Sequence, residues 1–261
     1  MSYFERLGPE SFRATGHVSG AWNEAEQHIA PALGLLAHVI ESDRDARRDD
    51  GLVIARLSYD ILGTVPVGPV RTAVEVLRPG RTIELVEATL SHGGRTVVRA
   101  RAWLMQPRPT SELAGSTLSR IAPPEDTEPW DPTTVWPGGF IESVEVRRTS
   151  AGPGRASFWV RTPIALVDDD KVSPLAAAAG LFDIANGMAV RADPQKVAFP
   201  NLDLTVHLFA EPRGEWIGFD TSVSFGADGI GLTSTALHDT SGPIGTMSQI
   251  LTVRPGAPAG P

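Results

Sequence analysis

The two halves of this chain end in segments with the same pattern of strand, glycine turn and strand. Residues 88–104 align with residues 236–252 when Gly94 is placed on Gly242, an offset of 148 residues. Both segments alternate apolar and polar residues around a short polar turn, which is typical of a β-hairpin. A chain with such a repeat is expected to fold as two similar units.

The repeat continues towards the start of each half. The same offset places the helical pattern of 26–41 on that of 174–189. The strand after each helix aligns at an offset nearer 147, with Leu57 on Leu204, and one small indel explains the difference. Each half therefore has the order strand, helix and about four strands. We predict an α+β fold in which each half curves an antiparallel sheet around one buried helix.

The two helical segments differ in their capping residues and in the position of proline. The pair Ser173-Pro174 suits an N-cap followed by proline at the first helical position. The segment 174–189 is apolar on nearly all sides, which indicates a buried helix. Pro31, inside 26–41, is expected to kink that helix or to begin it anew.

Proline content divides the chain into segments. Residues 107–137 hold seven of the 22 prolines and are predicted to form a linker, pinned to the surface by Trp130 and Trp136. We therefore expect an N-terminal unit at 1–106 and a C-terminal unit at 138–254. The remaining residues, 255–261, are expected to be a disordered tail.

Composition and charge exclude several classes of function. The chain has no cysteine, which excludes a disulfide framework, a cysteine nucleophile and thiolate metal sites. A formal net charge of −8 argues against a broad basic surface for nucleic acid. No apolar run reaches the roughly 18 residues of a membrane span, and no secretory signal is seen, so we expect a cytoplasmic protein. The charged run 43–50 is expected to be a solvated loop.

Several segments resemble the acyl-CoA thioesterase II group. The resemblance rests on the Leu-Asp strand and the following Glu-Trp pair in 202–219, the Gly-rich turn 226–231, the final strand 243–249, and residues 51–79 in the first half. It implies a double hotdog, with two hotdog units that each wrap a central helix. It also implies an acyl-CoA substrate whose pantetheine arm lies between the units, with no metal or redox cofactor. Because hotdog sheets commonly associate, a homodimer is expected.

The resemblance also implies a catalytic trio of Asp, Ser or Thr, and Gln that holds a water. It carries onto Asp203, Ser224 and Gln249, with Thr221 and Ser222 as competitors for the hydroxyl position. A carboxylate beside the water can orient it and take its proton. At the matching positions of the first half stand Val76 and Arg101, so chemistry is expected on the second half.

Other residues remain open as alternatives. Asp183 lies in the buried helix beside Asn186, and a buried carboxylate there needs a partner or a raised pKa. Asp60 is a second alternative, more readily explained as a structural partner of Arg56 or Arg71. His207 is interpreted as a packed or surface strand residue. Arginines that could bind CoA are Arg147, Arg148, Arg191 and Arg213.

Two other functions fit the same fold. One is a non-catalytic module that binds acyl-CoA or an acyl carrier. It is favoured by the sequence Ser-Phe-Gly-Ala-Asp-Gly at 224–229 and by Gln249-Ile250-Leu251 in place of the family's Gln-Glu-Gly. The other is a hotdog dehydratase or hydratase, which needs an Asp/His pair in one site.

Overall fold

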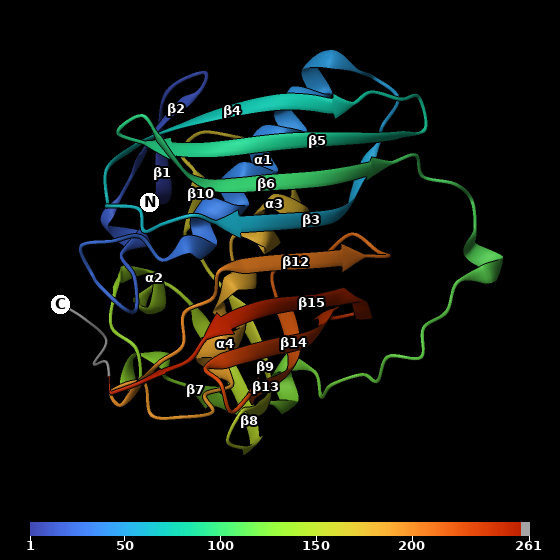
Figure 1. The fold of residues 1–261 in the computed structure, drawn as a ribbon. Coiled ribbons are helices and arrows are strands. Elements are labelled where there is room, and N and C mark those ends of the chain that lie inside the picture. Colours follow the sequence, from blue (N-terminus) through green and yellow to red (C-terminus); the bar gives the residue numbers. More distant parts are fainter. Residues whose placement is uncertain (257–261) are drawn as a thin grey trace.

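The computed structural model describes residues 1–256, and its first unit wraps a curved sheet around a long helix (Figure 1). The elements of this unit are β1 (Ser2–Gly8), β2 (Ser11–Ala14), α1 (Ile29–Arg47), β3 (Val53–Ile61), β4 (Pro69–Arg78), β5 (Ile83–His92) and β6 (Arg95–Met105).

The second unit repeats this order after the linker. Its elements are β7 (Pro129–Trp130), α2 (Gly139–Glu142), β8 (Glu145–Gly152), β9 (Arg155–Arg161), β10 (Ala165–Val167), α3 (Pro174–Ala179), α4 (Ala185–Met188), β12 (Asp203–Leu208), β13 (Ile217–Phe225), β14 (Ile230–Asp239) and β15 (Gly242–Thr252). Both predicted hairpins are present, as β5–β6 and β14–β15. The first hairpin turns on Gly93 and Gly94, which both have positive φ values that suit glycine.

Strands β3 and β12 join the two units into one sheet of 14 strands, in the order β10-β1-β2-β4-β5-β6-β3-β12-β15-β14-β13-β9-β8-β7. The two strands run antiparallel, with Ser58 opposite Thr205 and their hydroxyl oxygens 2.8 Å apart. These two residues are separated by 147 positions, the offset found in the sequence repeat. Equivalent residues therefore meet on a pseudo-two-fold axis, as in an isologous dimer interface.

The central helices of the two units pack against each other on the inner side of the sheet. Helix α1 buries its segment 30–41 completely, and a Cβ atom added at Gly34 would lie 2.7 Å from the Cα of Gly180. The predicted helix 26–41 begins at Ile29, so that Pro31 falls in its first turn, where proline is tolerated. Glycine at this crossing lets the two backbones approach closely.

The prediction of one continuous helix over 174–189 was wrong. Helix α3 ends at Ala179 with Gly180 as its C-cap, a 3-10 turn covers Phe182–Ile184, and α4 follows at once. Its expected start is correct, because the Ser173 hydroxyl caps the helix by accepting from the Ala176 N–H. The break places Asp183 in the turn between α3 and α4.

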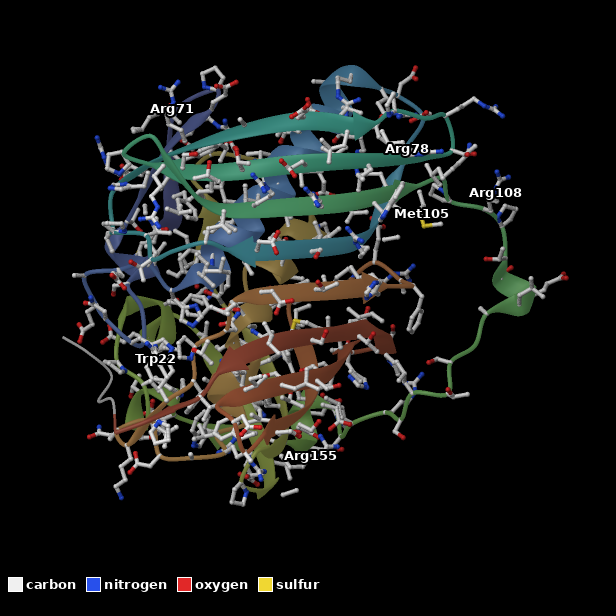
Figure 2. The ribbon with its side chains drawn as sticks, in the orientation of Figure 1. Trp22, Arg71, Arg78, Met105, Arg108 and Arg155 are labelled. Carbon is white, nitrogen blue, oxygen red and sulfur yellow. The ribbon has the colours of Figure 1, made fainter. Side chains whose placement is uncertain are left out.

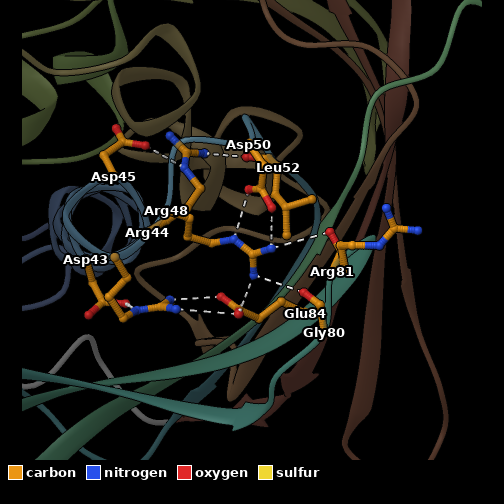
Figure 3. A network of polar contacts seen from close by, with 10 residues as sticks. Asp43, Arg44, Asp45, Arg48, Asp50, Leu52, Gly80, Arg81 and Glu84 are labelled. Carbon is orange, nitrogen blue, oxygen red and sulfur yellow. Dashed lines mark hydrogen bonds and ion pairs between the residues drawn. The ribbon is translucent and has the colours of Figure 1, made fainter.

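The charged run 43–50 is not a solvated loop, because α1 continues to Arg47. The guanidinium groups of Arg47 and Arg48 both bind Glu84 on β5, at 2.8 and 2.6 Å (Figure 3). Glu84 is 2% exposed, and a buried carboxylate requires such partners. The run therefore ties the end of α1 to the sheet.

Residues after β6 leave the sheet in an extended excursion that carries the 3-10 turn Ser111–Leu113 (Figure 1). Figure 2 shows Arg108 at the start of this excursion, away from both units. Further along, β7 (Pro129–Trp130) pairs with β8. Trp136 is 3% exposed, and its indole N–H donates to the Gly187 carbonyl at 2.8 Å. This end of the linker is thus part of the second unit's core.

The described chain ends in a short strand, β16 (Arg254–Pro255), which pairs with β11 (Val197–Ala198). Pro255, expected in the disordered tail, is therefore held by strand pairing. Gly256 is also held, since its N–H donates to the Lys196 carbonyl at 3.0 Å. The rest of the expected tail, 257–261, lies outside the described residues. No helix within residues 1–256 is both long and apolar enough to cross a membrane.

Candidate active site

Asp183 is the centre of a buried polar cluster in the second unit. Its Oδ1 atom accepts a hydrogen bond from the Asn201 side-chain amide at 2.6 Å and another from the Gln249 side-chain amide at 2.9 Å. Asn201 lies two residues before the start of β12, and Gln249 lies on the inner face of β15. Within residues 1–256, Oδ2 of the same carboxylate makes no side-chain hydrogen bond. One oxygen is thus fixed while the other stays available.

The environment of Asp183 changes its acidity. Burial raises the pKa of this carboxyl to about 7, although the hydrogen bonds from Asn201 and Gln249 oppose the shift by favouring the ionised form. A carboxylate with a pKa near 7 is both ionised to a useful extent and basic at neutral pH. These are the properties required of a general base.

Asp183 lines a cleft of about 630 Å³ where the two units meet. The second unit contributes Asp183, Asn186 and Asn201, and Arg254 lies at the cleft as well. The first unit contributes the loop before α1 and the end of β3, and Figure 2 shows Trp22 of that loop at the junction of the units. The lining residues from this unit include Gly20, Trp22, Gln27, His28, Ile29, Leu62, Gly63 and Val65.

The structure does not bring the expected trio of Asp203, Ser224 and Gln249 together. Asp203 lies on the outer face of β12, where its Oδ1 accepts from the Ile250 N–H at 2.7 Å. Ser224 is exposed on β13, which β14 and β15 separate from β12. Gln249 is completely buried on the opposite, inner face. Of the three, only the Gln249 side chain hydrogen-bonds to Asp183, whereas Asp203 meets the cluster through its backbone carbonyl, which accepts from the Asn201 amide at 3.1 Å.

The competing hydroxyls and His207 also lie outside the cluster. Thr221 is buried but shares a hydrogen bond with Thr235 on the neighbouring strand at 2.9 Å. Ser222 is exposed on β13, as is His207 on β12. Asn186 lines the cleft, but its amide donates to the Phe199 carbonyl at 3.4 Å. Asp183 is therefore the buried carboxylate at the cleft, which Glu26 also lines as a half-buried residue.

Asp60 is exposed on β3, directly opposite Asp203 across the β3–β12 junction. Within residues 1–256 it forms no ion pair, so the expected pairing with Arg56 or Arg71 is absent there. Asp60 contributes nothing to the cleft lining that the structure describes.

None of the four arginines expected to bind CoA is among the residues that line the cleft. Arg147 donates to the Pro124 carbonyl at 3.0 Å, and Arg148 stacks over Trp130 at 4.5 Å. Arg191 lies over Phe225, and Arg213 is exposed; neither lines the cleft. Arg254, which does line it, carried no motif in the sequence.

Solved structures with similar folds define the class of protein. A protein with a hot dog fold from Alicyclobacillus acidocaldarius superposes with a TM-score of 0.75 at 16% identity, over 98% of this chain and 96% of the other. An acyl-CoA thioesterase II from Mycobacterium marinum gives 0.64 at 16% identity, over 97% and 96%. The tesB protein of Mycobacterium avium subs. paratuberculosis gives 0.63 at 18% identity, over 97% and 96%. The chain is thus a double hotdog of the α+β class, as predicted.

Family profiles identify the chain more closely. Residues 18–105 match the acyl-CoA thioesterase N-terminal domain, and residues 122–253 match the acyl-CoA thioesterase C-terminal domain. The chain therefore belongs to this acyl-CoA thioesterase family, which confirms the resemblance seen in the sequence. No curated protein matches the chain significantly.

Proposed function

We propose that this protein hydrolyses acyl-CoA thioesters, with Asp183 as the general base that activates a water molecule. The observation that carries the proposal is the arrangement of the Asp183 carboxylate, which Asn201 and Gln249 hold by Oδ1 at an inter-unit cleft. Family membership supports the thioester substrate. The raised pKa of Asp183 supports the role of base.

In the proposed reaction, water lies against Oδ2 of Asp183 and attacks the thioester carbonyl carbon. Asp183 takes the proton as the new C–O bond forms, and the carbonyl oxygen becomes an oxyanion. The tetrahedral intermediate then collapses, the C–S bond breaks, and the proton on Asp183 passes to the departing CoA sulfur. Asn201 and Gln249 act as positioning residues, since their amide donors fix the carboxylate that contacts the water.

The cleft also offers groups for binding the substrate. Helix α1 directs its N-terminus at the cleft, where the Ile29 N–H makes no hydrogen bond within the described residues. Such a free N–H at a helix start favours negative charge, so it is a donor for the thioester oxyanion. Arg254 is the cation at the cleft, and we assign it to the CoA moiety. The homodimer remains a prediction, which sedimentation velocity would check.

One observation favours dehydration as a second candidate function. His28 of the first unit and Asp183 of the second line the same cleft, so an Asp/His pair shares one site. A dehydratase would need His28 to accept a proton from the carbon next to the carbonyl. The Nδ1 atom is already engaged, since it accepts the Ala30 N–H, which disfavours that role. Hydrolysis therefore remains the better supported function.

The test measures CoA release with a thiol reagent across short to long acyl-CoAs. Conversion of a 3-hydroxyacyl-CoA to the enoyl-CoA, followed by ultraviolet absorbance, is measured in parallel. Release of free CoA by the wild-type protein supports hydrolysis. Formation of enoyl-CoA without CoA release identifies the dehydratase. A rise in melting temperature with acyl-CoA but no turnover of either kind identifies a binding module.

A further inference from the structure

His28 occupies a fixed position at the start of α1. It is the N-cap of that helix, and its Nδ1 atom accepts the Ala30 N–H at 3.2 Å. The ring also packs on Phe140, with 4.2 Å between ring centroids and 30° between planes. One of these contacts is polar and the other apolar, and together they set the orientation of the imidazole ring.

The hydrogen bond at Nδ1 determines where the ring carries its proton. Because Nδ1 accepts, a neutral imidazole must carry its hydrogen on Nε2. Burial lowers the pKa of His28 to about 3, so the ring stays neutral at physiological pH. Within the described residues, Nε2 has no hydrogen-bond partner, and the ring lines the cleft that holds Asp183.

The start of α1 offers few other donors. The Ala30 N–H is occupied by His28 itself, and Pro31 has no N–H. The Ile29 N–H is therefore the free backbone donor of the first turn that the structure describes. Oxyanion sites typically combine more than one donor, and a side-chain N–H can serve beside a backbone group. A neutral imidazole N–H suits this task, because donating it requires no change of charge.

We propose that His28 is a catalytic residue whose Nε2–H donates a hydrogen bond to the thioester carbonyl oxygen and stabilises the oxyanion formed by water attack. This role rests on the proposed hydrolysis. It makes the two units complementary, since the first supplies the oxyanion donor and the second supplies the base. It also explains why a histidine, rather than a simpler capping residue, begins α1.

Two substitutions separate the donor role from the capping role. His28→Asn keeps a capping oxygen near the position of Nδ1, and asparagine is a favourable N-cap, but it removes the Nε2 donor. His28→Gln places an amide N–H near the position of Nε2 and loses the cap. We expect His28→Asn to melt close to the wild-type temperature with kcat lowered about 100- to 1,000-fold and KM little changed. We expect His28→Gln to melt lower but to keep more of the kcat.

Each outcome of this comparison decides the proposal. A His28→Asn protein with wild-type kcat overturns the donor role, and so does a His28→Gln protein that is folded but no more active than His28→Asn. If Asp183→Asn abolishes CoA release while His28→Asn does not, the hydrolase stands and this inference fails. If the wild-type protein releases no CoA from any acyl-CoA, the proposed function fails, and the role of His28 fails with it.

Discussion

Replacing Asp183 with asparagine should stabilise the protein against heat at pH 8 and have little effect near pH 4. The wild-type carboxyl has its pKa raised from 3.8 to about 7, because burial penalises the ionised form more than the hydrogen bonds from Asn201 and Gln249 favour it. Asparagine is neutral at every pH and can accept both hydrogen bonds through its own Oδ1. The substitution therefore removes the cost of ionising a buried group.

The direction of this pH dependence follows from the difference in bound protons between the folded and unfolded states. Between about pH 4 and pH 7 the folded protein holds a proton on Asp183 that the unfolded chain has lost, so wild-type stability falls as pH rises through this range. Above pH 7 this loss of stability is complete, and the full shift in the pKa of Asp183 corresponds to about 4 kcal/mol in the free energy of unfolding. Water in the open cleft relieves part of it, which leaves about 2–4 kcal/mol. For a chain of this size that corresponds to about 5–10 °C in melting temperature.

The assay is calorimetry or dye-monitored melting of wild type, Asp183→Asn and Asp203→Asn at pH 5 and pH 8. Asp203 is a matched control, since its carboxylate lies on the outer face of the same region and is hydrogen-bonded to a backbone N–H. We expect the gap between Asp183→Asn and wild type to widen from pH 5 to pH 8, and no such widening for Asp203→Asn. A gap that is the same at both pH values, or an Asp183→Asn protein less stable than wild type at pH 8, would refute the reasoning.

Three further predictions follow from the same contacts. The kcat/KM for CoA release should rise with pH through about 7 on a single limb, because Asp183 must be ionised to act as base, and a flat profile from pH 5 to 9 would contradict this. Gln249→Leu should lower kcat about 10- to 100-fold and move that limb to higher pH, since it removes a hydrogen bond that favours the carboxylate; an unmoved limb would show that Gln249 does not tune the base. Glu84→Leu should lower the free energy of unfolding by about 1–3 kcal/mol in urea titrations, because it removes the buried carboxylate that Arg47 and Arg48 share, and an unchanged free energy of unfolding would contradict the network in Figure 3.

The duplication was predictable because it rests on periodicity and turn residues, which are local. The offset of 147 between Leu57 and Leu204 is the offset between Ser58 and Thr205, which meet on the pseudo-two-fold axis. The break between α3 and α4 was not predictable in the same way. Gly180, the C-cap of α3, packs closely on Gly34 of the other unit, and no window of sequence contains that contact.

The fold favours Asp183 over Asp203 as the carboxylate at the cleft, for a physical reason that the sequence does carry. Alternation along β12 places Asp203 on the face of Thr205 and His207, which is the outer one. Alternation along β15 places Gln249 with Met247 and Leu251, which are buried. Side chains on opposite faces of one sheet cannot share a water. Asp183 lies in the turn between α3 and α4, on the same side of the sheet as Gln249, with which it hydrogen-bonds. Asn201, in a connection before a strand, carried no periodic signal.

The proposed role of Asp183 in thioester hydrolysis is tested most directly by CoA release from Asp183→Asn compared with Asp203→Asn, on the acyl-CoA that the wild type hydrolyses fastest. We expect Asp183→Asn to lose about 100- to 10,000-fold in kcat while remaining folded, and Asp203→Asn to stay within about threefold of wild type. Loss of activity in Asp203→Asn with activity retained in Asp183→Asn would contradict this role.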